Sequence, residues 1–306
     1  MSSFLAIVVC AVAALADGPV VRRDIVYDRN HPESCLGDLL LPERVTPNTP
    51  VVLTIHGGGW RSGDRYSWVG VADFFRCELG FASFNIEYRK AREAPWPACG
   101  DDCIQAAKFI LGGGLAAYGV SPRRIWVCGG SAGGHLALWT GLSISSSNVA
   151  GVVSLSGIGD TTPDFAAHRG RYQGFLGSEV TPQLLRSASP LSLIRAGGPR
   201  ILCTHATEDR VVPISSARNF AEAYRVAGND IRFYEYPAED PSEFSHFIWR
   251  KGSDPHRLNG HLESAIRAFV SGAGHRTAEL KKLGKALGIE TVVVSLDGKP
   301  GEIELK

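Results

Sequence analysis

The sequence has almost no net charge and no block of basic residues. Its 32 lysines and arginines nearly balance 31 aspartates and glutamates, which leaves a formal net charge of +1 at pH 7. Nucleic acids and anionic membrane surfaces are bound through a strong basic excess or a Lys/Arg cluster, so neither is expected as a partner. Internal repeats and low-complexity tracts are lacking as well. The 306 residues, 44% of them hydrophobic, suffice for one large α/β domain or two small ones.

A hydrophobic run long enough to span a bilayer is also lacking. The apolar stretch from Phe4 to Ala16 has 13 residues, whereas a membrane-spanning helix needs about 20. It fits the hydrophobic region of a secretory signal with small residues before a cleavage site, although its amino-terminal region carries only the terminal amine. The sequence therefore predicts a signal peptide over residues 1–16 and a secreted or periplasmic protein. The alternative is a buried N-terminal segment.

Cleavage after residue 16 would leave six cysteines. An even number in an exported protein permits disulfides, but their pairing does not follow from the sequence. Cys128 and Cys203 lie inside apolar runs, so we expect them to be buried free thiols that pack as small hydrophobic groups.

Short apolar runs alternate with helix-like stretches along most of the chain. The expected strands are 24–28, 51–55, 81–88, 125–128, 149–155, 201–205 and 231–236. The expected helices are 67–79, 101–113, 132–143, 214–227 and 257–271. This alternation indicates the α/β class, with a mostly parallel, doubly wound sheet of about eight strands covered by helices on both faces.

Two segments interrupt the alternation. Residues 158–196 form a long insert with small helices at most, and long connections in compact domains are often functional lids. Residues 274–306 follow the end of the α/β pattern and are expected to form a helix and a hairpin-like extension. We therefore predict an α/β domain over residues 17–273, with a small cap inserted near 158–196, followed by the C-terminal extension.

Ser131 stands among four glycines in the segment GGSAGG, residues 129–134. The segment follows an expected strand and precedes an expected helix, which is the context of a nucleophile elbow. Glycine is costly in regular structure, so its repeated use indicates close backbone packing around one presented side chain. We predict that the Ser131 hydroxyl is a nucleophile at a helix N-terminus, where partial positive charge favours an anion. The alternative is a Gly-rich turn with a passive serine.

A second glycine-rich segment, HGGGW at residues 56–60, ends the expected strand before it. A developing oxyanion needs pre-aimed N–H donors, and flexible glycines can turn their N–H groups inward. We assign Gly57 and Gly58 as donors, with the Ala132 N–H as the third. His56 is expected to anchor this loop rather than to act as a base. An ordinary β-turn is the alternative.

A hydroxyl nucleophile needs a base, and the base needs an orienting acid. The chain order in this architecture is serine, acid, histidine. Asp209 lies in the loop after an expected strand and is the predicted acid, with Glu208 as its alternative. His246 lies in the next strand-to-helix loop and is the predicted base. His256 and His261 are its alternatives, at or inside the following helix.

These motifs resemble the α/β-hydrolase superfamily and, within it, the carboxylesterase branch of hormone-sensitive-lipase-like and feruloyl or acetyl esterase-like enzymes. The likeness runs from about residue 19 to 272 and is carried by HGGGW with RSGD after it, GGSAGGH, ATEDRVVP, and a Ser-His pair before the last core helix. FLGSEVTPQLLRSASPLSLI resembles the cap of that branch. Ala206 departs from the glycine usual in the family, the residues before His246 are unusually acidic, and the tail beyond 273 has no counterpart.

The resemblance implies a catalytic triad of Ser131, Asp209 and His246, an oxyanion hole at Gly57, Gly58 and Ala132, and no metal or organic cofactor. The expected reaction is hydrolysis of carboxylic esters through an acyl-enzyme on Ser131. Small acyl or polysaccharide-linked esters are the expected substrates. The alternatives are an arylformamidase or peptidase on the same scaffold, and a catalytically silent binding module. The oligomeric state is not predicted.

Four aromatic residues are candidates for the walls of a substrate pocket. They are Trp60 beside the oxyanion loop and Phe165, Tyr172 and Phe175 in the cap insert. The alternative is that the cap residues pack the insert onto the core.

Overall fold

The computed structural model describes residues 20–237, 246, 257–272, 291–296 and 299–304. The predicted signal peptide, His256 and the expected helix of the tail lie outside the described residues. In the described ranges, no helix combines the length and the apolar character that crossing a membrane requires.

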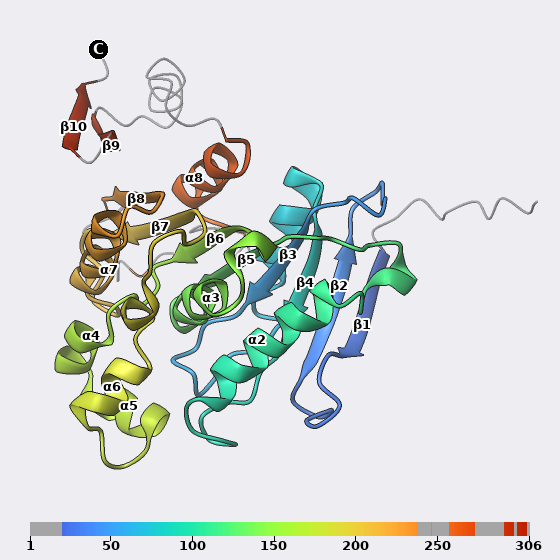
Figure 1. Cartoon of the computed structure of the whole chain (residues 1–306), viewed down its shortest axis with the longest axis horizontal. Helices are drawn as coiled ribbons and strands as arrows, with labels where there is room; N and C mark the ends of the chain where they lie inside the picture. The colour runs from blue at the N-terminus through green and yellow to red at the C-terminus, as the bar shows by residue number, and fades with distance from the viewer. Residues whose placement is uncertain (1–19, 238–245, 247–256, 273–290, 297–298, 305–306) are drawn as a thin grey trace, which may run out of the picture.

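An eight-stranded sheet forms the centre of the described chain, in the order β1-β2-β4-β3-β5-β6-β7-β8 (Figure 1). Its strands are β1 (Val20–Val26), β2 (Leu36–Leu41), β3 (Val51–Ile55), β4 (Ala82–Ile86), β5 (Ile125–Gly130), β6 (Val149–Leu155), β7 (Ile201–Ala206) and β8 (Ile231–Tyr236). β1 pairs antiparallel with β2, and β2 with β4, while all other neighbours are parallel. The predicted fold class is confirmed, but the sequence pattern does not predict β2.

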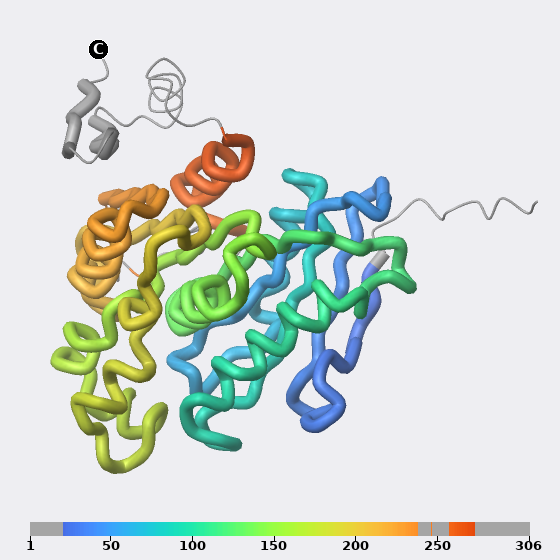
Figure 2. The backbone as a smooth tube through the Cα atoms, viewed as in Figure 1, coloured from blue at the N-terminus to red at the C-terminus, as the bar shows by residue number. Residues whose placement is uncertain are grey.

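Helices cover both faces of the sheet (Figures 1 and 2). One face carries α1 (Val69–Asp73), which continues as a π-helical turn over Phe74–Glu78, and α8 (Gly260–Val270). The other face carries α2 (Ala98–Leu111), α3 (Ala132–Ser143) and α7 (Ile214–Val226).

Successive residues of the central strands point to opposite faces of the sheet. Val52, Trp126, Val153 and Leu202 are buried in the core under α1 and α8. Their neighbours Leu53, Val127, Val152 and Ile201 are buried in the core under α2, α3 and α7. Because both faces are covered, these strands are continuous apolar runs without the polar alternation of a half-exposed sheet.

The insert between β6 and β7 folds into short helices that lie together near α7 (Figure 1). They are α4 (Thr161–Ala167), α5 (Arg169–Leu176) and α6 (Pro182–Ser187), followed by a 3₁₀ turn over Pro190–Leu193. Asp160 and Thr181 cap α4 and α6, since their side chains accept hydrogen bonds from the backbone N–H groups of Thr162 and Leu184. Small helices are what the sequence predicts for this segment.

Strands β9 (Thr291–Leu296) and β10 (Lys299–Glu304) form a separate antiparallel pair in the tail. The six cysteines of the described chain are free thiols, and Cys128 and Cys203 are buried, as expected.

Candidate active site

Ser131 lies at a sharp turn between β5 and α3. Its φ is +56°, in the left-handed region that side chains other than glycine rarely adopt. The turn packs against the end of β3, and a Cβ on Gly133 would lie 2.2 Å from the carbonyl oxygen of Ile55. The Ser131 N–H is held by the Leu155 carbonyl at 2.8 Å. The glycines therefore make room for a strained residue, which is the reason the sequence suggests for them.

The glycine-rich loop after β3 lies directly against this turn. A Cβ on Gly57 would lie 3.2 Å from the Cβ of Ser131, and a Cβ on Gly58 would lie 2.1 Å from the carbonyl oxygen of Ser62. No described residue accepts a hydrogen bond from the N–H of either glycine. Ala132 is the first residue of α3, so its N–H has no carbonyl acceptor within the helix. Gly57, Gly58 and Ala132 line the same cavity as Ser131.

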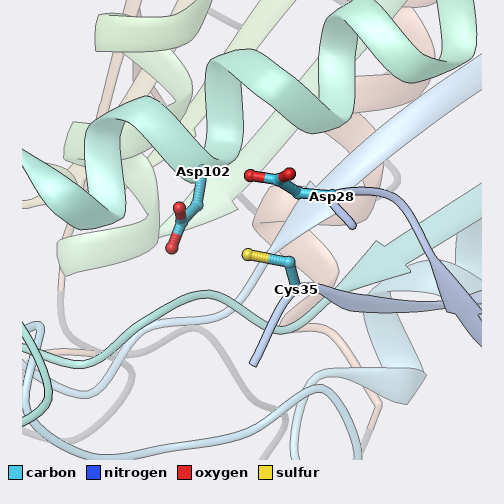
Figure 3. A group of neighbouring side chains, drawn as sticks. All are labelled: Asp28, Cys35 and Asp102. Carbon is cyan, nitrogen blue, oxygen red and sulfur yellow. The ribbon is translucent and has the colours of Figure 1, made fainter. Parts of the chain in front are cut away.

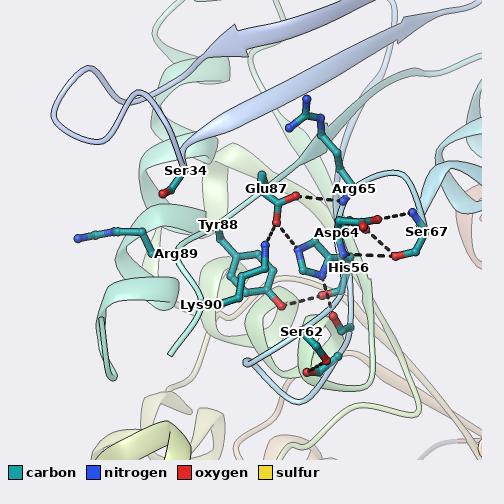
Figure 4. A network of polar contacts seen from close by, with 12 residues as sticks. Ser34, His56, Ser62, Asp64, Arg65, Ser67, Glu87, Tyr88, Arg89 and Lys90 are labelled. Atoms are coloured by element: carbon teal, nitrogen blue, oxygen red, sulfur yellow. Dashed lines mark hydrogen bonds and ion pairs between the residues drawn. The ribbon is translucent and has the colours of Figure 1, made fainter. Parts of the chain in front are cut away.

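His56 is a fully buried side chain that anchors the glycine-rich loop (Figure 4). Its Nδ1 lies 2.6 Å from the Gly57 carbonyl oxygen, and its Nε2 lies 2.9 Å from Oε1 of Glu87. Burial raises the pKa of Glu87, but His56 and Lys90 outweigh this effect and lower it to about 2, so the carboxylate stays ionised. Because the Gly57 carbonyl turns toward His56, the Gly58 N–H across the same trans peptide points the opposite way.

Ser131 and its neighbours line a cavity of about 440 Å³. The lining residues are Gly57, Gly58, Gly59, Trp60, Ser62, Gly63, Ser67, Trp68, Ser131, Ala132, Ile158, Arg171, Val211 and His246. The cavity thus collects the predicted nucleophile, the predicted base and the three predicted oxyanion donors.

Trp60 lines this cavity, whereas the other three aromatic candidates do not. Phe175 stacks on Trp60 with ring centroids 4.0 Å apart, and Tyr172 meets Trp60 edge-on at 5.6 Å. Phe165 packs in turn against Tyr172. Large aromatic surfaces gain most from mutual burial. Phe165, Tyr172 and Phe175 therefore pack the cap onto the core, which is the alternative interpretation of these residues.

Asp209 and His246 are joined by a hydrogen bond of 2.7 Å between Oδ2 and Nδ1. The other oxygen, Oδ1, accepts from the backbone N–H groups of Val211 and Val212 at 2.8 and 2.9 Å. Burial opposes ionisation of this carboxyl, but hydrogen bonds and charges from His205 and His246 outweigh it and hold the pKa of Asp209 well below its usual range. In the described part of the chain, Nε2 of His246 has no hydrogen-bond partner, and His246 lines the same cavity as Ser131.

The alternative acid and base lie elsewhere. Glu208 is exposed, and His261 stacks on Tyr236 with ring centroids 5.5 Å apart. Neither residue lines the cavity. His246 lines the cavity, and Asp209, which does not line it, is hydrogen-bonded to His246. The geometry therefore favours Asp209 and His246 over these two candidates.

His205 is a contact of Asp209 that sequence reasoning does not single out. It lies near the end of β7 and is fully buried. Its Nε2 lies 3.3 Å from Oδ2 of Asp209 and 2.9 Å from the carbonyl oxygen of Val212. The sequence signal that could have found it is a histidine at the end of an apolar strand, four residues before the predicted acid. The strand pattern alone explains this histidine as an ordinary core residue.

Arg171 connects the cap to the loop of Asp209. From α5, its Nη1 lies 3.0 and 3.1 Å from the two carboxylate oxygens of the buried Asp164. Its Nη2 donates to the carbonyl oxygen of Val211 at 2.9 Å. A cation therefore lines the cavity with its charge already balanced by a buried partner.

His135, in α3, connects three parts of the site. Its Nδ1 accepts from Nε1 of Trp60 at 3.2 Å, so its Nε2 carries the proton and donates to the Ala188 carbonyl at 2.6 Å. Burial lowers the pKa of His135 to about 4, although the bond to Ala188 opposes the shift. The neutral ring thus links the elbow helix, the glycine-rich loop and the cap.

This buried imidazole predicts a loss of stability in acid. The unfolded chain binds a proton at His135 near pH 6.5, while the folded chain binds it only near pH 4. The free energy of unfolding should therefore fall by about 3 kcal/mol from this group as the pH drops from 6.5 to 4. Urea unfolding of the unaltered protein and of His135→Gln should differ most above pH 6.5 and least near pH 4. A difference that does not change with pH would contradict the prediction.

A cluster outside the cavity contains possible metal ligands (Figure 3). One ligand atom each from Asp28, Cys35 and Asp102 lie within 4.8 Å of one another. Arg89 already pairs with Asp102 through Nη2 at 2.6 Å, and its backbone N–H donates to the other carboxylate oxygen at 2.8 Å. Burial raises the pKa of the Cys35 thiol to about 12, and a metal would need the thiolate. The residues fit an ion-paired structural cluster better than a metal site.

A serine on a strand-to-helix turn of a mostly parallel sheet shares its cavity with a histidine from later in the chain, and this histidine is hydrogen-bonded to an acid. This arrangement defines the α/β-hydrolase class. Comparison with known families agrees with this class and narrows it. A family profile described as BD-FAE matches residues 37–224, more than half of the chain. The chain belongs to this family.

Its relatives carry esterase names. The chain is 28% identical to esterase LipC of Mycobacterium tuberculosis over 239 residues, which cover 71% of this chain and 59% of LipC. It is 30% identical to the probable isoprenylcysteine alpha-carbonyl methylesterase ICMEL1 of Arabidopsis thaliana over 235 residues, 69% of this chain and 48% of that protein. The chain thus spans about half the length of these curated relatives.

Solved esterase structures share the fold. One is a thermophilic esterase, Est2 with propionate bound, from Thermogutta terrifontis, with a TM-score of 0.66 and 24% sequence identity. The similarity covers 84% of this chain and 95% of that one. It therefore extends over nearly the whole of the solved esterase.

Proposed function

We propose that this protein is a serine hydrolase that cleaves carboxylic esters through an acyl-enzyme on Ser131. The 2.7 Å bond between His246 and Asp209 carries the proposal. This bond places the proton of the neutral imidazole on Nδ1 and leaves Nε2 as an acceptor at the cavity that Ser131 lines. The esterase names of the relatives support the same reaction class.

In the first half of the reaction, Nε2 of His246 takes the proton from Oγ of Ser131 as that oxygen attacks the ester carbonyl carbon. The carbonyl electron pair moves onto its oxygen. When the tetrahedral intermediate collapses, the bond to the alcohol oxygen breaks and His246 returns the proton to the leaving alcohol. Water, deprotonated by His246, then attacks the acyl carbon, which releases the acid and restores Ser131.

The negative charge of the intermediate is stabilised by fixed donors and by the acid. The N–H groups of Gly57, Gly58 and Ala132 serve as the oxyanion hole, where losing one donor costs about 10²–10³-fold in rate. Asp209 keeps the imidazole in the required tautomer and stabilises the imidazolium that forms. Its low pKa keeps it ionised throughout.

The size of the cavity favours short acyl groups. Its volume of about 440 Å³ lies in the lower part of the roughly 300–1,000 Å³ of small-molecule pockets. Trp60 and Ile158 give it apolar surface, and Arg171 adds a donor whose charge is balanced by Asp164. We infer small acyl esters, with polysaccharide-linked esters as the class to test beside them.

A labelling experiment and a substrate panel test this function. A fluorophosphonate probe should modify Ser131, as identified by peptide mass spectrometry. The same preparation should hydrolyse p-nitrophenyl acetate and butyrate faster than the octanoate, and acetylated xylan should be compared with feruloylated xylan. Faster turnover of aryl formamides or peptide anilides would instead indicate the alternative enzyme classes. No labelling and no turnover would indicate a silent binding module.

A further inference from the structure

The carboxylate of Asp209 is held on every side, and one of its contacts has no part in the reaction described so far. Oδ1 accepts from the backbone of Val211 and Val212. Oδ2 bonds to Nδ1 of His246 at 2.7 Å and lies 3.3 Å from Nε2 of His205. Two imidazoles therefore share one oxygen of the predicted acid. His205 comes from the sheet itself, and its side chain is fully buried.

The surroundings of His205 show which of its nitrogens carries the proton. Nε2 faces two acceptors, the carbonyl oxygen of Val212 at 2.9 Å and the Asp209 carboxylate. A lone pair at Nε2 would face both oxygens and be repelled. Nδ1 is buried and has no hydrogen-bond partner within the described chain, so a proton there would bury an unsatisfied donor. The arrangement fits a neutral ring with its hydrogen on Nε2.

We propose that His205 is a positioning residue for the catalytic acid, whose Nε2–H, anchored on the Val212 carbonyl, holds Oδ2 of Asp209 in line with His246. The inference rests on the proposed esterase function. The same N–H also takes up part of the negative charge on Oδ2. Its removal should leave the carboxylate less well oriented and more strongly attractive to a proton on His246.

The other charged groups near this contact are few in the part of the chain that the structure describes. Arg171 reaches the same loop at the Val211 carbonyl, with its charge balanced by Asp164. Glu208 and Arg210, on either side of Asp209, are exposed. His205 and His246 are therefore the titratable groups that lie against the Asp209 carboxylate.

Two variants of similar side-chain volume distinguish a role of His205 as a hydrogen-bond donor from a role that only fills space. His205→Met removes the N–H, whereas His205→Gln keeps an N–H donor at about the reach of Nε2. We expect His205→Met to lower kcat about tenfold with KM within about twofold. The acid limb of its pH–rate profile should move up by about half a pH unit. His205→Gln should restore most of kcat and the original acid limb, and thermal unfolding should confirm that both variants are folded.

Equal kcat and equal acid limbs in the two variants would overturn the role of His205 while the esterase function stands. Absence of Ser131-dependent turnover in the unaltered protein would overturn the proposed function itself. A measurement on the unaltered protein covers the case in which the variants do not fold. Nitrogen-15 spectra of labelled histidine, recorded at pH 8, should show the neutral ring of His205 as the Nε2–H tautomer. An Nδ1–H tautomer would overturn the proposal.

Discussion

Replacing Ser131 with alanine is expected to lower kcat/KM for p-nitrophenyl acetate by about 10⁴–10⁶-fold. The variant keeps the cavity and the His246–Asp209 bond but has no oxygen to form the acyl-enzyme. The thermal unfolding midpoint should change little, because the Ser131 hydroxyl makes no hydrogen bond to the described residues. Initial-rate kinetics and a thermal melt on the same preparation check both parts.

Ser67→Ala provides a matched control, since Ser67 lines the same cavity but bonds within its own loop to Asp64. It should keep activity within a few-fold of the unaltered protein. Turnover that survives Ser131→Ala, or falls as much in Ser67→Ala, would show that the nucleophile is another group. The activity of Asp209→Asn should lie between those of the two serine variants, with a loss of about 10⁴-fold in kcat.

Gly133→Ala is expected to destabilise the fold by about 3 kcal/mol or more. The added methyl carbon would lie 2.2 Å from the carbonyl oxygen of Ile55 and 2.5 Å from that of His56. Both contacts are backbone atoms at the end of a central strand, so no side chain can move aside to relieve them. Urea unfolding should show the loss, and failure to accumulate folded protein would be the same result in its extreme form.

Gly170→Ala is the control for this substitution. Gly170 lies in α5, and a Cβ there would meet nothing within 4 Å. Alanine favours a helix over glycine by about 1 kcal/mol, so this variant should be as stable as the unaltered protein or more so. Equal losses in the two variants would contradict the close approach at Gly133.

The alternation of strands and helices predicts most of the fold, and its failures have physical causes. β2 is not predicted because its sequence, LGDLLL, contains no β-branched or aromatic residue. The strand forms because β1 and β4 pair with it on either side, and such pairing often decides strand formation over propensity. The helix expected over 67–79 begins as α1 and then continues as a π-helical turn, a change of winding that the apolar pattern does not encode.

The residues of the candidate site were predictable where they belong to short contiguous motifs. The elbow around Ser131 and the loop at Gly57 and Gly58 are contiguous motifs, and their spacing from strands indicates their place. Contacts between side chains were not predictable in the same way. Glu87, which directly follows the neighbouring strand β4, lies against His56, and the loop after β7 brings Asp209 back to His205. Each of these residues has an ordinary explanation in its own segment.

The bonds of His135 limit how the cap of this protein could be replaced. One ring nitrogen of His135 accepts a hydrogen bond from the Trp60 indole, and the other donates to the Ala188 carbonyl. Phe175 stacks on the same indole. A foreign cap grafted in place of residues 158–196 would have to supply an equivalent carbonyl and an equivalent ring. Otherwise the Trp60 side chain would lose its fixed position, and the N–H groups of the neighbouring glycines would no longer be held in the orientation that the oxyanion needs. Selectivity and turnover are thus expected to change together when this segment is exchanged, in directed evolution as in natural divergence.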